Sequence, residues 1–224
     1  MIELHEADCR SVLQALPSES VDLVLTDPPY GMKYRSNRRV ASRRFRPIEG
    51  DADSSLFTEV VADLHRVLRD NRHIYVFCSW HRVDEFKQQF ERFFSLKNIL
   101  VWNKNNHGSG DLKGAFAPKH EFILFGHKGR RELNRRIPDV LDFAKLSSSA
   151  LTHPTEKPTD LLKTLIEVSS QPGETVLDCF AGTGSTGLAC VAAGRRAVLI
   201  ERDSEFAARA RERLGLDALP EWLQ

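Results

Sequence analysis

Cysteine and long apolar runs are both scarce in this chain. Among its 224 residues there are four cysteines, and no two of them stand in the Cys-x-x-Cys spacing of zinc and redox sites. Neither a metal site nor a disulfide framework is therefore predicted, which favours a reducing, cytoplasmic setting. No apolar run approaches the roughly 20 residues of a membrane span, and the N-terminus lacks a signal-peptide pattern. We therefore expect no membrane partner.

A net charge of one sign is also missing. Lys and Arg number 32 against 31 Asp and Glu, a formal net charge of +1, so the chain lacks the composition of a generally basic nucleic-acid-binding protein. The cations are nevertheless concentrated between residues 33 and 46, a run that holds no acid: Lys33, Arg35, Arg38, Arg39, Arg43, Arg44 and Arg46. Length and a hydrophobic content of 41% predict a single domain over residues 1–224.

Residues 21–30 read VDLVLTDPPY and are the most informative stretch of the chain. The apolar first half is typical of a buried strand. Pro28 and Pro29 cannot continue a sheet ladder, so they end the strand in a rigid turn. Asp27 and Tyr30 are thereby held at the carboxyl end of a strand, which is where ligands bind in open α/β sheets.

This turn suits a reaction in which the exocyclic amino group of a nucleobase acts as the nucleophile. Such an amine is a poor nucleophile because its lone pair is delocalised into the ring. The Asp27 carboxylate and the Pro28 carbonyl can accept both N–H groups, which localises the lone pair and stabilises the cation that forms. Tyr30 offers a face on which a flipped-out base can stack. The alternative is a plain Asp-Pro-Pro turn with a surface tyrosine.

A glycine-rich motif lies far downstream, where residues 175–187 read TVLDCFAGTGSTG. A predicted strand is followed by glycines in the spacing G-x-G-x-x-G, at Gly182, Gly184 and Gly187, and by a helix. The next predicted strand ends at Glu201, where a carboxylate can accept ribose hydroxyls. The pattern indicates a nucleotide-binding β-α-β unit.

The acid at Asp178 discriminates between two cofactors for this unit. A dinucleotide loop must accept a pyrophosphate, and a carboxylate just before the loop would repel it. The same carboxylate would attract the ammonium and sulfonium groups of S-adenosylmethionine. A nicotinamide oxidoreductase would share the glycine motif but would give the DPPY turn no role.

Residues 153–158, HPTEKP, form a third motif before a helical pattern and on their own fit a plain helix entry. Together the three motifs resemble the β group of DNA amino-methyltransferases, in which DPPY precedes the FxGxG motif as it does here. The resemblance covers nearly the whole chain and includes the acid at Asp8, although Ala7 stands where the family usually has Gly. It implies S-adenosylmethionine bound by Asp8, Asp27, His153, Thr155, Lys157, Asp178, Phe180, Gly182, Gly184 and Glu201, and a catalytic motif of Asp27, Pro28, Pro29 and Tyr30.

The implied fold is a single Rossmann-like α/β domain with helices on both faces of a mostly parallel, seven-stranded sheet. One strand is antiparallel, and the N-terminal strand continues the order begun by the C-terminal ones. The sequence pattern predicts strands near 2–5, 21–26, 73–78, 97–103, 120–126, 175–180 and 196–201. It predicts helices near 10–15, 54–69, 80–93, 158–170, 185–193 and 203–213.

The implied activity is methylation of adenine N6 in double-stranded DNA, in a bacterial or phage protein of the restriction–modification type. Cytosine N4 stays open as a target, although cytosine enzymes of the family more often carry Ser in place of Asp27. A non-catalytic DNA-binding protein is disfavoured because Asp27, Tyr30 and Phe180 are all present. We expect a basic DNA-contacting loop over 33–50 and a short target-recognition region over 104–152; a homodimer is compatible with both.

Overall fold

The computed structural model describes residues 1–30, 55–105, 113–145 and 156–217. Its strands are β1 (Ile2–Glu6), β2 (Val21–Thr26), β3 (Leu68–Cys78), β4 (Ser95–Asn103), β5 (His120–Lys128), β6 (Val140–Asp142), β7 (Thr175–Asp178) and β8 (Arg196–Glu201). Its helices are α1 (Cys9–Ala15), α2 (Ser55–Val67), α3 (Val83–Glu91), α4 (Thr159–Ser169), α5 (Ser185–Ala193) and α6 (Ser204–Arg213).

One sheet carries the described strands in the order β1-β8-β7-β2-β3-β5-β4-β6. Pairing is parallel except at β5, which is antiparallel to both of its neighbours, β3 and β4. β1 pairs with β8, so the N-terminal strand continues the order of the C-terminal ones. The predicted open α/β sheet with one antiparallel strand is therefore confirmed.

Two details of the predicted elements are wrong. The sheet has an eighth strand, β6, which pairs with β4 and buries only Leu141, so it is too short to show an alternating pattern. The helix predicted over 54–69 ends at Val67, and the next strand starts at once with the buried Leu68. The polar residues 69–72 concealed that early start, because they carry no strand-like alternation.

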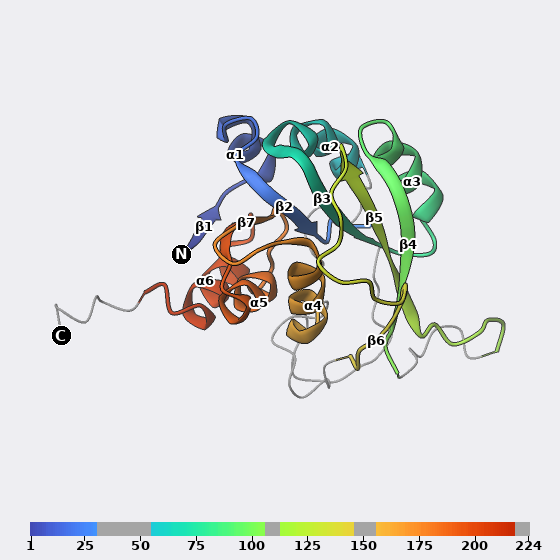
Figure 1. Ribbon diagram of the computed structural model, residues 1–224. Helices are drawn as coiled ribbons and strands as arrows, with labels where there is room; N and C mark the ends of the chain where they lie inside the picture. Colours follow the sequence, from blue (N-terminus) through green and yellow to red (C-terminus); the bar gives the residue numbers. More distant parts are fainter. Residues whose placement is uncertain (31–54, 106–112, 146–155, 218–224) are drawn as a thin grey trace, which may run out of the picture.

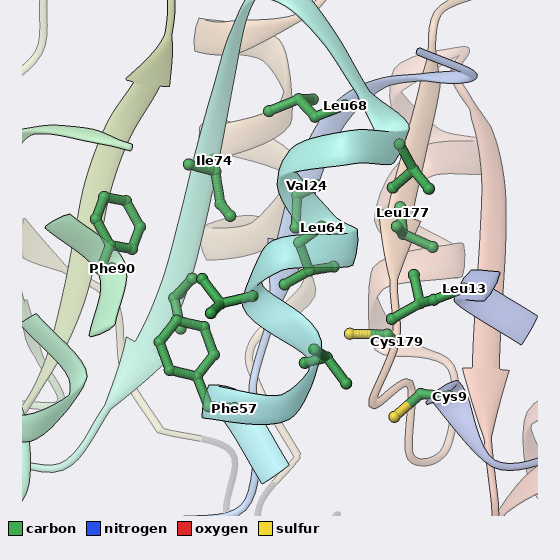
Figure 2. Close-up of a cluster of buried hydrophobic side chains, with 14 of the residues drawn as sticks. Cys9, Leu13, Val24, Phe57, Leu64, Leu68, Ile74, Phe90, Leu177 and Cys179 are labelled. Atoms are coloured by element: carbon green, nitrogen blue, oxygen red, sulfur yellow. The ribbon is translucent and has the colours of Figure 1, made fainter. Parts of the chain in front are cut away.

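Helices cover both faces of the sheet, with α1, α2 and α3 on one side and α4, α5 and α6 on the other (Figure 1). On the first side, Phe57 and Leu64 of α2 pack against Val24, Ile74 and Leu177 of the central strands (Figure 2). On the other side, the apolar faces of α4 and α5 pack against Tyr75 and Leu199, among others. No helix within the described ranges is long and apolar enough to cross a membrane.

The central strand β2 positions the site. All six of its residues are buried, and it lies between β7 and β3. Because β2, β7 and β8 run parallel, the segments that follow them meet at one edge of the sheet. That edge, here called the catalytic edge, carries Asp27, Phe180 and Glu201.

Gly184 has the left-handed φ of 84° at the start of α5. A Cβ at this position would lie 3.2 Å from the Cβ of Ala210 on α6, so both the backbone conformation and the close helix contact require glycine.

Candidate active site

The DPPY and HPTEKP motifs meet in the folded chain. Asp27 follows β2 directly, and its Oδ2 accepts a hydrogen bond from the ammonium of Lys157, 130 residues away. Its Oδ1 accepts a hydrogen bond from the hydroxyl of Tyr30. The Tyr30 ring lies edge-on to Phe86 of α3, with ring centroids 6.2 Å apart, so packing fixes its position. The predicted catalytic residues Asp27 and Tyr30 therefore form one cluster, which Pro28 and Pro29 hold by ending the strand.

Two charged residues that sequence reasoning had not assigned complete this cluster. Glu121 stands at the start of β5, and its Oε1 accepts a hydrogen bond from the Lys104 ammonium. Lys157 Nζ lies 3.3 Å from Glu121 Oε2 and 5.0 Å from the centre of the Phe77 ring. The four groups, called here the charge cluster, are Asp27, Glu121, Lys104 and Lys157. Two carboxylates thus face two ammonium groups at the catalytic edge.

A sequence signal for Glu121 does exist. β5 begins with His-Glu ahead of an apolar run, and an antiparallel strand brings its first residues, rather than its last, to the edge where parallel strands end. An acid at the start of that strand could therefore have been included in the site.

Burial and charge act against each other within the charge cluster. Burial lowers the pKa of Lys157, but the Asp27 and Glu121 carboxylates outweigh it and hold that pKa above its usual range. Burial would raise the pKa of Glu121, but Lys157 and Lys104 reverse the direction and lower it. Burial raises the pKa of Tyr30 well above its usual value, and Asp27 adds to that effect, so the phenol stays a donor. Lys157 is accordingly a fixed cation, and Glu121 a fixed anion.

Asp178, at the end of β7, organises the glycine loop. Its Oδ1 accepts hydrogen bonds from the Thr26 hydroxyl at 3.0 Å and the Phe180 N–H at 3.1 Å. Its Oδ2 accepts one from the Thr186 hydroxyl at 2.6 Å. Only 4% of the residue is exposed, and burial raises the pKa of Asp178 to about 6. The loop is thus tied to β2 and α5, while attraction of a cofactor cation by Asp178 stays a prediction.

Glu201, at the end of β8, faces the same loop. Its Oε2 accepts a hydrogen bond from the Gly182 N–H and its Oε1 one from the Asp203 N–H, both at 2.8 Å. A Cβ added at Gly182 would meet no atom within 4 Å, so open space lies beside the loop. Burial raises the pKa of Glu201. A carboxylate at the rim of an open glycine loop fits a bound ribose.

Asp8 lies beside Glu201, because the Ala7 N–H donates to the Glu201 carbonyl at 3.0 Å. Asp8 caps α1, and its carboxylate binds the Arg10 guanidinium through both oxygens. The hydrogen bond from Arg10, against a smaller effect of burial, lowers the pKa of Asp8, so the residue is anionic. The predicted contact with a cofactor adenine is left as a prediction.

A second ion pair, also unassigned from sequence, links the HPTEKP motif to the glycine loop. Arg213 at the end of α6 lies 2.5 Å from Glu156 and donates to the carbonyl and hydroxyl of Thr183. Glu156 precedes Lys157, so this pair also fixes the segment that carries the lysine of the charge cluster.

Some of the predicted residues are not brought together by the described structure. His153, Thr155 and the entire basic run from Lys33 to Arg46 lie outside the described residues, so those assignments stay predictions. Within the expected target-recognition region, Arg131 binds Glu174, which precedes β7 and lies at the opposite edge of the sheet from Asp27. That part of 104–152 is therefore remote from the catalytic edge.

An open, mostly parallel sheet with a glycine loop, an acidic strand end and a DPPY turn along one edge is the arrangement expected of an S-adenosylmethionine-dependent methyltransferase. The chain belongs to the N6 and N4 DNA methylase family, whose family model matches residues 21–212. It is 35% identical to the methylase YubD of Escherichia coli K12 over 216 residues, which are 96% of this chain and 90% of that protein. It is 28% identical to the DNA adenine methyltransferase YhdJ of the same organism, covering 89% and 78% of the two chains.

Solved structures agree. The complex of M1.HpyAVI with S-adenosylmethionine has a TM-score of 0.74 at 25% identity, covering 96% of this chain and 99% of that one. The cytosine-N4-specific PvuII DNA methyltransferase has a TM-score of 0.78 at 17% identity, covering 99% and 89%, and shows the fold alone. The predicted family, fold and cofactor, S-adenosylmethionine, are therefore confirmed.

Proposed function

We propose that this DNA methyltransferase transfers a methyl group to the exocyclic N6 of adenine in double-stranded DNA. The observation that carries the proposal is the Asp27 carboxylate, held at the end of β2 beside the Tyr30 ring. A full negative charge at this position stabilises the positive charge that develops on an attacking amine.

The residues divide the work as follows. Asp27 and the Pro28 carbonyl accept the N–H groups of the target amine and localise its lone pair. Tyr30 presents its ring to the flipped-out base. When bound, S-adenosylmethionine supplies an activated methyl group. Glu201 and Asp8 would hold its nucleoside end, and Asp178 keeps the glycine loop in shape beneath it.

Cytosine N4 is the second candidate. The family contains both adenine-N6 and cytosine-N4 enzymes, and both exocyclic amines are poor nucleophiles for the same reason. YhdJ is named as an adenine enzyme, whereas the PvuII enzyme is named as cytosine-N4-specific and is only 17% identical. The acid at Asp27 and the 28% identity to YhdJ support adenine. A homodimer and a cytoplasmic location are further predictions.

Single-molecule sequencing of DNA from cells that express the chain tests the proposal, because it reports the modified base and its context together. We expect N6-methyladenine in one short context, and none from cells that express the Asp27→Ala variant. N4-methylcytosine at defined positions would instead show that cytosine N4 is the target. A calorimetric titration in which NAD bound more tightly than S-adenosylmethionine would contradict both.

A further inference from the structure

Both oxygens of Asp27 are already engaged by the protein itself. Tyr30 donates to Oδ1 and Lys157 donates to Oδ2. The reaction requires an Asp27 oxygen to accept an N–H from the target amine. The Lys157 ammonium competes for that oxygen, and it also repels the positive charge that develops on the amine. The arrangement therefore holds Asp27 in a blocked state that the target must relieve.

Glu121 offers Lys157 a second position. Its Oε2 is buried and accepts no hydrogen bond from the described residues, although Lys157 Nζ is only 3.3 Å away. Its Oε1 is held by Lys104, whose ammonium in turn lies 5.1 Å from the Trp102 ring of β4. Glu121 is thus anchored on one oxygen, while the other has only the 3.3 Å ion-pair contact with Lys157 and no well-formed hydrogen bond, which is costly for a buried acceptor.

We propose that Glu121 is a positioning residue that draws the Lys157 ammonium away from Asp27 when the target base enters. Asp27 Oδ2 is then free to accept the N–H of the amine, while Lys157 completes its hydrogen bond to Glu121 Oε2. Lys104 keeps Glu121 in place during this exchange. The inference rests on the proposed function, since it concerns the same amine acceptor.

Charge balance makes the exchange feasible. The charge cluster holds two cations and two anions, so moving Lys157 from one carboxylate to the other changes no net charge in the site. The pKa of Lys157 is raised by both carboxylates, so the group stays protonated in either position. Burial raises the pKa of Asp27 and the Lys157 ammonium opposes that effect, so the Tyr30 hydroxyl and the N–H of the target amine must hold the carboxylate ionised once Lys157 has moved.

The decisive variants are Glu121→Gln, Lys157→Met and the two combined, studied by single-turnover methyl transfer and by binding of S-adenosylmethionine. Glu121→Gln leaves Lys157 on Asp27, so we expect a methyl-transfer rate about 10- to 100-fold lower. This factor corresponds to the free energy of one charge-assisted hydrogen bond. Cofactor affinity and the KM for DNA should stay close to those of the unmodified protein. Glu91→Gln, which removes an exposed acid on α3, is the matched control and should change neither quantity.

The double variant separates positioning from a merely structural role. If Lys157 blocks Asp27 once Glu121 is gone, Glu121→Gln/Lys157→Met should be faster than Glu121→Gln alone. A double variant no faster than Glu121→Gln, or a Glu121→Gln rate equal to that of the unmodified protein, would overturn the inference. Should Glu121→Gln fail to fold, Glu121→Asp withdraws the carboxylate from Lys157 and permits the same comparison. An unmodified protein that methylates no DNA would instead refute the proposed function.

Discussion

At the scale of single residues, the two acids at neighbouring strand ends have different surroundings and different expected roles. The Asp27 side chain is 22% exposed and faces the charge cluster, whereas Asp178 is 4% exposed and its oxygens are taken up by the loop. Asp27→Ala should lower the methyl-transfer rate by about 10²–10³-fold, as loss of a key electrostatic contact does. Affinity for S-adenosylmethionine, measured by calorimetry, should be largely kept. Turnover like that of the unmodified protein would remove Asp27 from the mechanism.

Asp178 predicts a pH dependence of cofactor binding. Burial raises its pKa to about 6, and a bound sulfonium or ammonium group favours the ionised form. Below pH 6 the carboxylate is protonated and must release its proton first, so affinity should fall by up to about tenfold per pH unit. Above pH 7 affinity should be constant. Asp178→Asn should bind more weakly with a flat profile between pH 5 and 7, and an identical profile in both proteins would assign the effect to another group, such as Glu201.

At the scale of elements, the contact between β5 and α3 is tight enough to require glycine. A Cβ on Gly126 would lie 2.5 Å from Phe90 Cε1 and 2.9 Å from the Ser95 carbonyl oxygen. Gly126→Ala should therefore lower the free energy of unfolding by about 1–3 kcal/mol, as overpacking of a core does. Urea denaturation would measure the loss. Adding Phe90→Leu should recover part of it, and strict additivity of the two changes would show that the clash is relieved elsewhere.

The elements that sequence could predict are those with strong local patterns. β2 and β8 are continuous apolar runs, and α4 shows its buried leucines at helical spacing, so each was placed within a residue or two. β6 could not be predicted, because three residues carry no pattern and its pairing with β4 depends on the rest of the sheet. The start of β3 is not predicted for a similar reason, because residues 69–72 are polar and the register with β2 is interrupted between Leu68 and His73.

The site shows the same division. The order of the motifs and the polarity of parallel strands predict that Asp27, Asp178 and Glu201 lie along one edge. The charge cluster depends on which strand is antiparallel, and local pattern alone does not identify it; the His-Glu start of β5 indicates Glu121 only once that strand is known, and Lys104 has no comparable signal. The resemblance assigns both Lys157 and Asp27 to the cofactor, which stays a prediction; the hydrogen bond between them spans 130 residues, and no local spacing encodes it.

At the scale of the whole molecule, some cations are paired with acids of the fold and others stand in a segment of the sequence without acids. At the edge opposite Asp27, Asp22 is 2.6 Å from Arg69 and 3.3 Å from Arg72, and Glu174 binds Arg131. These three arginines are paired with acids of the same chain. The basic run 33–46 instead follows the DPPY turn directly in sequence and contains no acid. The net charge of +1 therefore does not reveal the cationic segment that follows the proposed base-binding turn in the sequence.

This difference predicts how DNA binding responds to salt. If about three to five cations of the run touch phosphates, each adds roughly 0.9 to the slope of log affinity against log salt concentration. Replacing Arg38, Arg39, Arg43 and Arg44 with Ala should weaken binding to all DNA sequences and flatten the slope, without changing affinity for S-adenosylmethionine. The alternative assigns the phosphate contacts to residues 104–136. Arg135→Ala, an exposed cation of that region 3.8 Å from Glu167, is therefore the matched control and should leave the slope unchanged. If the quadruple variant kept its slope and affinity and Arg135→Ala flattened the slope, the phosphate contacts would be assigned to residues 104–136 and not to the basic run.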